Sequence, residues 1–142
     1  MRPQWKTAVG LLAAAGALAV AACSSGSGTN TAADTPLNLP PASAFKTGTC
    51  ATIATPVLAI GRFTHDKAKA ETLTVEDRKF LVDNGELVKA ELAKADKALS
   101  DQMLEMLVSI GFVRIQIGKT YKPELLAEVE NQRTKLQTMC TN

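Results

Sequence analysis

The sequence predicts an all-α fold: a small up-down helical bundle, with four helices as the favoured count, closed by one disulfide. A signal peptide (1–22) and a flexible linker (23–46) precede the predicted helical bundle domain (47–142). Three observations support this organisation. Apolar residues recur at spacings of three and four from about Gly48 onward, two cysteines stand in the first and last predicted helices, and a Ser/Gly/Thr-rich stretch separates the helices from an apolar N-terminus.

The N-terminal segment has the composition of an export signal. Arg2 and Lys6 give it a positive end, and residues 7–22 carry no charge. The alternative is an uncleaved transmembrane helix. This run is shorter than the ~20 apolar residues that a span needs, and it is rich in weakly hydrophobic alanine. Cleavage before Cys23 is therefore favoured.

The run Val20-Ala21-Ala22-Cys23, followed at once by a Ser/Gly-rich spacer, resembles the lipobox of bacterial membrane lipoproteins, in a form similar to the actinobacterial ones. The resemblance implies that the Cys23 thiol carries a diacylglycerol, with acyl chains such as palmitate, and that the new amine is a further site of acylation. It predicts a protein held on the extracytoplasmic face of the cell membrane through acyl chains on Cys23, because two or three chains anchor stably where one does not.

The charge balance argues against a nucleic-acid partner. The chain has 16 basic and 14 acidic residues, and the two-charge excess lies in Arg2 and Lys6 of the signal. The mature part is therefore neutral, without the basic excess of a nucleic-acid-binding or polybasic membrane surface. A chain of 142 residues is expected to form one domain.

The cysteines predict one internal disulfide. With Cys23 assigned to lipid, Cys50 and Cys140 remain, and an exported domain lies where disulfides persist. Two free buried thiols are the alternative. A metal pair is disfavoured because neither cysteine has a second thiol or a histidine nearby.

Two helices are predicted in the first half of the bundle. The first has Pro56 inside it and carries an apolar stripe formed by Cys50, Ile53, Val57 and Ile60. The second begins at Thr74, which forms a capping box with Asp77. Its stripe is formed by Leu81, Val88, Leu92, Ala95 and Leu99.

Two further helices complete the bundle. Ser100 is expected to cap the third, which runs to Ile117 and ends at Gly118. The fourth has Pro123 in its first turn and ends at Cys140. Its inner face is formed by Leu125, Val129, Leu136 and Met139.

The disulfide and the helix count support each other. In an up-down bundle with an even number of helices, the first helix begins at the end where the last one stops. Cys50 and Cys140 meet only under that condition. The linker is expected to join at the same end, which would then face the membrane.

The sequence contains no recognisable catalytic, metal or cofactor motif. His65 is the single histidine and stands in a charged helix-end sequence, where an exposed side chain is expected. A Gly-x-Ser-x-Gly nucleophile motif, Glu-x-x-His metal pairs and a phosphate-binding glycine loop are all missing. We therefore expect no enzyme, no metal and no cofactor.

The third helix is apolar nearly all round, which marks either a central helix or one that faces a partner. Because a four-helix bundle has no fully enclosed helix, some of its apolar residues are predicted to form a surface for a lipid, a small apolar ligand or a partner helix. The candidates are Met103, Met106, Ile110, Phe112 and Ile117. The alternative is complete coverage by the other helices and by the segment 37–41.

Two functions remain open at this stage. The first is a lipid-anchored binding or interaction module at the cell envelope, with an apolar ligand or an envelope protein as partner. The second is a non-catalytic structural or regulatory accessory of a larger envelope complex.

Overall fold

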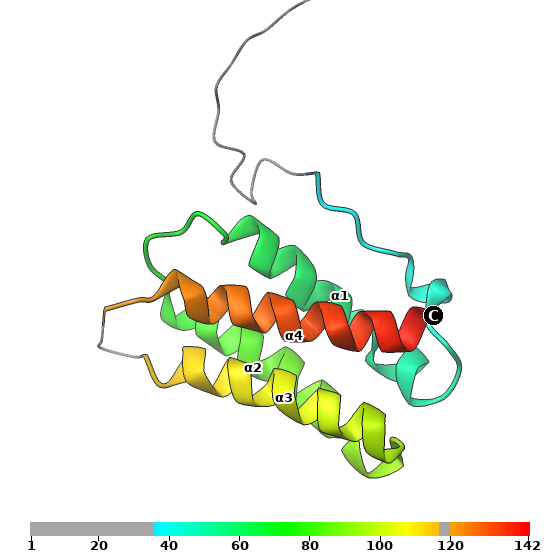
Figure 1. Cartoon of the computed structure of the whole chain (residues 1–142). Coiled ribbons are helices and arrows are strands. Elements are labelled where there is room, and N and C mark those ends of the chain that lie inside the picture. Colours follow the sequence, from blue (N-terminus) through cyan, green and yellow to red (C-terminus); the bar gives the residue numbers. More distant parts are fainter. Residues whose placement is uncertain (1–35, 117–119) are drawn as a thin grey trace, which may run out of the picture.

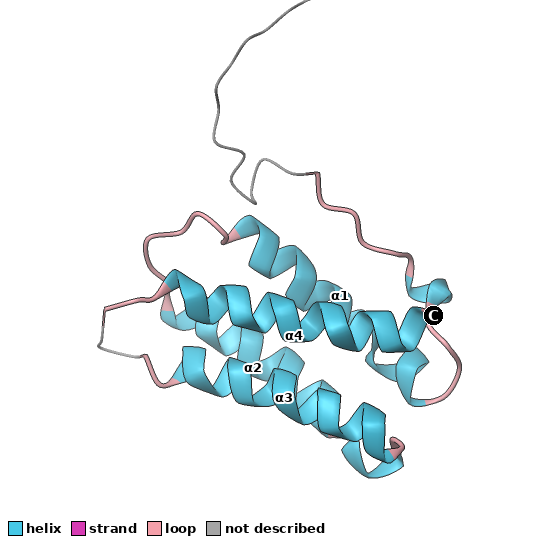
Figure 2. Ribbon diagram, viewed as in Figure 1, coloured by secondary structure: helices cyan, strands magenta, loops and turns pink. Residues whose placement is uncertain are grey.

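The computed structural model describes residues 36–116 and 120–142 as an all-helical domain, without strands in these ranges. Its elements are η2 (Ala42–Ala44), α1 (Thr49–Asp66), α2 (Val75–Lys89), η3 (Leu92–Lys94), α3 (Lys97–Arg114) and α4 (Pro123–Thr141). Each long helix packs on the next along the chain, and α4 returns to pack on α1 (Figure 1, Figure 2). The predicted four-helix fold is confirmed.

The core fills the space between the four helices. Its largest fully buried side chains come from all of them: Ile53, Val57, Ile60, Leu81, Val88, Met103, Met106, Val113, Val129, Leu136 and Cys140. Pro56 lies inside α1 and is buried with this core. On α4 the predicted inner face is right at Val129 and Leu136. It is wrong at Met139, which is 37% exposed, because the buried face instead continues through Leu126, Arg133 and Cys140.

The boundary between the second and third helices differs from the prediction. α2 ends at Lys89, and Leu99 belongs to the next long helix. The cap of α3 is Asp96, whose carboxylate accepts a hydrogen bond of 3.0 Å from the Leu99 N–H, so Ser100 lies within the first turns. Ser and Asp are both favoured capping residues, so the predicted and the observed cap rest on the same chemistry. The position was wrong because the apolar periodicity continues across the short 3-10 turn between α2 and α3 and hides the end of α2.

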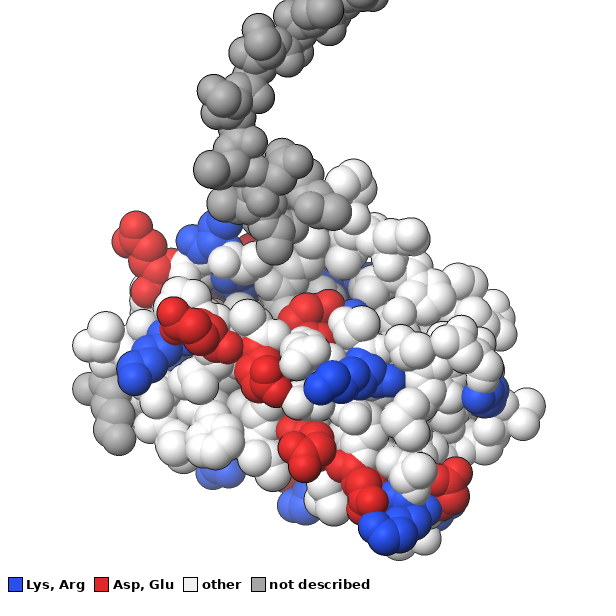
Figure 3. Space-filling model, in the orientation of Figure 1, with Lys and Arg blue, Asp and Glu red and all other residues white. Residues whose placement is uncertain are grey.

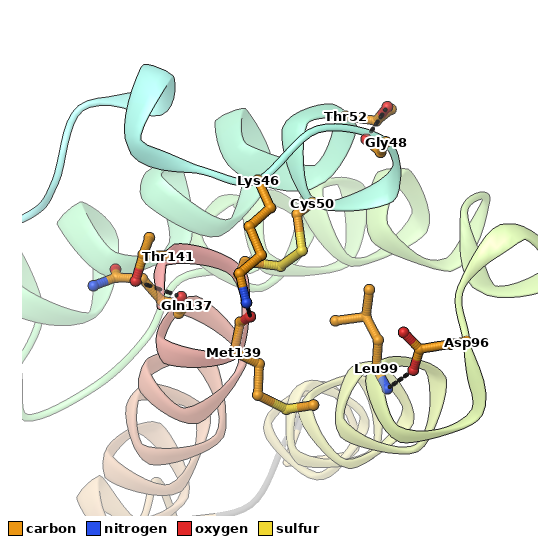
Figure 4. Close-up of a disulfide and its surroundings, with 10 residues drawn as sticks. Lys46, Gly48, Cys50, Thr52, Asp96, Leu99, Gln137, Met139 and Thr141 are labelled. Atoms are coloured by element: carbon orange, nitrogen blue, oxygen red, sulfur yellow. Dashed lines mark hydrogen bonds between the residues drawn. A yellow bond between two sulfur atoms is a disulfide. The ribbon is translucent and has the colours of Figure 1, made fainter.

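The predicted disulfide is present and joins the start of α1 to the end of α4. The Cα atoms of Cys50 and Cys140 lie 5.3 Å apart, although 90 positions separate them in sequence. Beside the bond, Lys46 satisfies the last turn of α4: its backbone N–H donates to Cys140 O and its Nζ to Met139 O (Figure 4). Gly48, at φ +80°, makes the turn from this segment into α1.

Residues 36–46 lie on the bundle, although the sequence assigned them to the linker. Phe45 is buried at 6% exposure, and Leu39 packs against Gly61 in α1. Leu37 lies beside Thr64 and Pro123, at the end of the bundle opposite the disulfide. The linker meets the bundle at the disulfide end, as expected, because Lys46 lies beside Cys140. The prediction missed that residues 36–46 run back along α1, so that Leu37 lies near the C-terminal end of that helix (Figure 1).

Loss of the Cys50–Cys140 bond should lower the free energy of unfolding by about 4 kcal/mol, because a bond that closes so long a loop removes much of the freedom of the unfolded chain. The measurement is urea unfolding of the oxidised and reduced protein, with Cys23→Ser in both so that only this pair differs. Coincident unfolding curves would contradict the prediction.

The capping box at the start of α2 should make stability depend on pH. The Asp77 carboxylate accepts a bond of 2.9 Å from the Thr74 N–H and lies 3.0 Å from Lys67 Nζ. Burial raises the pKa of Asp77, but these hydrogen bonds outweigh burial and leave the pKa below its ordinary value of 3.8. Because the folded-state pKa is lowered, the stabilisation is present above the unfolded-state pKa and is lost as the pH falls through the folded-state value.

Asp77→Asn should therefore lower the unfolding free energy near neutral pH, and the difference from the native chain should disappear as the pH falls below about 4. Thr74→Ala serves as the control, because it removes about 1 kcal/mol of capping energy without removing the carboxylate. Urea unfolding between acid and neutral pH measures both. A difference for Asp77→Asn that stays constant down to the lowest pH would contradict the prediction.

Candidate functional site

The predicted apolar surface on the third helix is placed differently by the structure. Met103 and Met106 are 0% exposed and Ile110 is 4% exposed, so these three belong to the core and their assignment to a surface is wrong. Phe112 is 52% exposed, as the hypothesis requires. Ile117 lies outside the described residues.

A second set of apolar side chains on α3 is exposed instead. Together with Phe112 it forms the α3 stripe, which consists of Leu104 (46% exposed), Val108 (53%), Phe112 (52%) and Ile115 (59%). The spacings of four, four and three place these side chains along one side of the helix. They lie on the side of the helix away from the buried Met103, Met106 and Ile110.

The sequence contains a weak signal for this stripe. Four residues interrupt the apolar run: Glu105, Ser109, Arg114 and Gln116. Ser109 is nevertheless only 4% exposed, and its hydroxyl is satisfied there by donating a bond of 2.7 Å to Met106 O. A buried serine of this kind removes the polar marker that would have shown the phase of the helix. Gly85 gives a better clue, because α3 approaches it closely: a Cβ there would meet Leu107 at 3.3 Å and Ile110 at 3.4 Å.

A hollow of about 450 Å³, the α1–α4 pocket, lies where the C-terminal end of α1 meets the N-terminal end of α4. Its apolar lining comes from Leu37, Ala68, Pro123, Leu126 and Ala127, and its polar lining from Thr64, His65, Glu124 and Glu130. Sequence reasoning missed this pocket, because its walls come from three separate segments and its alanines have no apolar periodicity.

A buried polar network lies beside the pocket, in the contact between α1 and α4, which we call the α1–α4 seam. Arg133 is 3% exposed and donates to both carboxylate oxygens of Glu130, at 2.8 and 2.7 Å, and to Gln137. Thr64 also donates to Glu130. The guanidinium has room because residue 61 is glycine: a Cβ at Gly61 would lie 3.1 Å from Arg133 Cζ.

His65 lies at the edge of the α1–α4 pocket. Its side chain is 27% exposed, and Nδ1 lies 3.4 Å from the Asp66 carboxylate. The neighbouring Thr64 hydroxyl lies within hydrogen-bonding distance of both the Glu130 carboxylate and the Gly61 carbonyl.

The carboxylates that line the pocket are those of Glu124 and Glu130. Burial and the nearby Glu124 carboxylate raise the pKa of Tyr121, which precedes α4. Elsewhere on this side of the molecule, acidic and basic side chains are interspersed (Figure 3). Within the described residues, no group of three or more His, Cys, Asp or Glu side chains is placed to hold a metal ion. None of the described helices is long and apolar enough to cross a bilayer.

Cys23 lies outside the described residues, so lipidation remains a prediction from the sequence. Comparison with known proteins gives no match among family models, curated proteins or solved structures.

Two glycine substitutions should separate packing from helix propensity. Gly111→Ala should raise the free energy of unfolding by about 0.5–1 kcal/mol, because it lies inside α3 with nothing within 4 Å of the new Cβ. Gly61→Ala should not raise the free energy of unfolding in this way. The new Cβ would lie 3.1 Å from Arg133 Cζ, and the hydrogen bonds of Arg133 keep its side chain from moving aside. Urea unfolding of the two variants tests this, and equal stabilisation by both would contradict it.

Proposed function

We propose that this protein is a lipid-anchored cell-envelope protein that presents a small helical interaction module on the outer face of the membrane. The observation that carries the proposal is the α3 stripe, four apolar side chains in line on the solvent side of one helix. Exposed apolar side chains that occur singly need no explanation, whereas a contiguous line of them is typical of interaction sites.

The shape of the α3 stripe favours a protein partner. It is a convex line along a helix with spacings of three and four, which suits packing against an apolar helix of a partner. Of the wider set of partners that the sequence left open, an envelope protein therefore has the best support.

The anchor side of the proposal rests on the run Val20-Ala21-Ala22-Cys23. The course of the chain is consistent with it. The described chain begins at Pro36 beside α1 and α4, whereas α3 packs on α2 and α4 and lies diagonally across the bundle from α1. A tether that leaves on this side would keep the α3 stripe clear of the membrane.

Substitution in the α3 stripe should abolish the interaction without unfolding the domain. The protein is extracted from its own membranes and weighed by native mass spectrometry, as the native chain and as Phe112→Asp. A charged residue in an apolar contact should cost about 2 kcal/mol or more, enough to remove a partner that the native chain retains. Thermal unfolding checks that the variant is folded, as expected for a half-exposed side chain.

Leu87→Asp is the matched control, because Leu87 is 59% exposed but lies on α2. Loss of the partner with Phe112→Asp alone supports the proposal. Equal binding by the native chain and both variants would overturn the role of the α3 stripe, and an unacylated Cys23 would overturn the anchor. A fixed stoichiometric complex with a membrane protein would assign the second function, that of an accessory to an envelope complex.

A further inference from the structure

The α1–α4 pocket is separate from the α3 stripe and has the properties of a binding site for a chain-like apolar group. Its volume of about 450 Å³ falls in the range of small-molecule sites. Leu126 and Pro123 form its wall on α4, and Ala68 and Ala127 leave it open because their side chains are short. An apolar group placed there would remove these side chains from water.

Within the described part of the chain, the residues that line the pocket include no lysine or arginine to pair with an anionic ligand. Among the described residues that line it, the carboxylates are Glu124 and Glu130, and the single basic group is His65. Glu130 is held in place by Arg133 and Thr64, so its carboxylate stays at the pocket wall. A fatty acid carboxylate or a phosphate head group would therefore find no lysine or arginine among these lining residues, whereas an acyl chain joined through an ester or amide is uncharged and needs none.

The course of the chain brings one such group to the pocket. Leu37 is both a wall of the pocket and the second described residue after the segment that leads from Cys23. The two positions are 14 residues apart, which limits the distance between them to about 50 Å at full extension. A group attached through a short linker of this composition is held at a millimolar effective concentration.

We infer that the α1–α4 pocket binds one of the acyl chains attached to Cys23 of the same molecule. The inference rests on the lipid anchor of the proposed function but not on the α3 stripe. The remaining chains stay in the bilayer, which two acyl chains suffice to hold. Seating one chain draws the ends of α1 and α4 that form the pocket towards the membrane and leaves α3 facing away from it.

Photo-cross-linking of the acyl chain tests the inference on the full chain in its membrane. Cells are fed a fatty acid that carries a terminal diazirine, the membranes are irradiated, and cross-linked peptides of the purified protein are identified by mass spectrometry. The expected product links the acyl group of Cys23 to residues 64–68 or 123–130. In a second preparation half of the cells are grown on heavy isotopes, and the two solubilised proteins are mixed and reconstituted into vesicles before irradiation. Links that join a light acyl group to a heavy peptide then identify contacts between two molecules.

Ala127→Trp should abolish this cross-link, because Ala127 is an exposed residue whose enlargement fills the pocket. Ala98→Trp is the matched control, an equally exposed alanine on α3 outside the pocket. Thermal unfolding shows whether each variant is folded. If Ala127→Trp is unfolded, Ala68→Trp fills the same pocket from the turn that follows α1.

Each other result overturns the inference in a recognisable way. An acylated Cys23 without a link to the pocket, or with the same link in Ala127→Trp, overturns the binding site and leaves the proposed function intact. A phospholipid or the acyl chain of a second molecule in the pocket overturns the assignment to the chain's own anchor. A Cys23 without acyl groups overturns the anchor and the inference together.

Discussion

The contact between the first and last helices is the constraint on which the remaining structure depends. The Cys50–Cys140 bond fixes it at one end, and the hydrogen bond from Thr64 on α1 to Glu130 on α4 fixes it towards the other. Closing α4 onto α1 makes the bundle a ring of four helices. It also creates the seam along which residues 36–46 lie. The α1–α4 pocket exists because the seam opens where Ala68 meets the start of α4.

Much of the fold was predictable because two independent features of the sequence, the apolar periodicity and the cysteine positions, indicate the same fold. The apolar periodicity indicated helices, and the two cysteines required an even number of them, so a wrong count would have separated Cys50 from Cys140. The capping box of Thr74 and Asp77 is equally local and is confirmed. The start of α3 was not predictable in the same way. Leu92, Ala95 and Leu99 continue the phase of α2 across a 3-10 turn, so periodicity did not reveal the break at Asp96.

The candidate surface was harder to predict than the fold, for a physical reason. On a helix that is apolar nearly all round, periodicity gives no phase, and only the positions of α2 and α4 decide which side is covered. Met106 and Phe112 have similar hydrophobicity, yet one is buried and the other half-exposed. The course of residues 36–46 was likewise invisible, because a few contacts such as that of Leu39 on Gly61 fix a segment that has no periodic pattern.

The α1–α4 seam contains two features that do not favour stability, a glycine inside a helix and a buried ion pair. We infer that their role is to hold side chains in position. A glycine inside a helix loses about 1 kcal/mol relative to alanine, and a buried ion pair is often no better than apolar packing. What the arrangement of Gly61, Arg133 and Glu130 provides is a single geometry. The guanidinium packs over Gly61 of α1, and its two bonds hold the Glu130 carboxylate in place within α4. The Thr64 hydroxyl of α1 donates to that carboxylate, and this bond between the helices sets the register of α4 on α1. An apolar seam would tolerate sliding by fractions of a turn, whereas this one holds Glu130 and the adjoining wall of the pocket in one place.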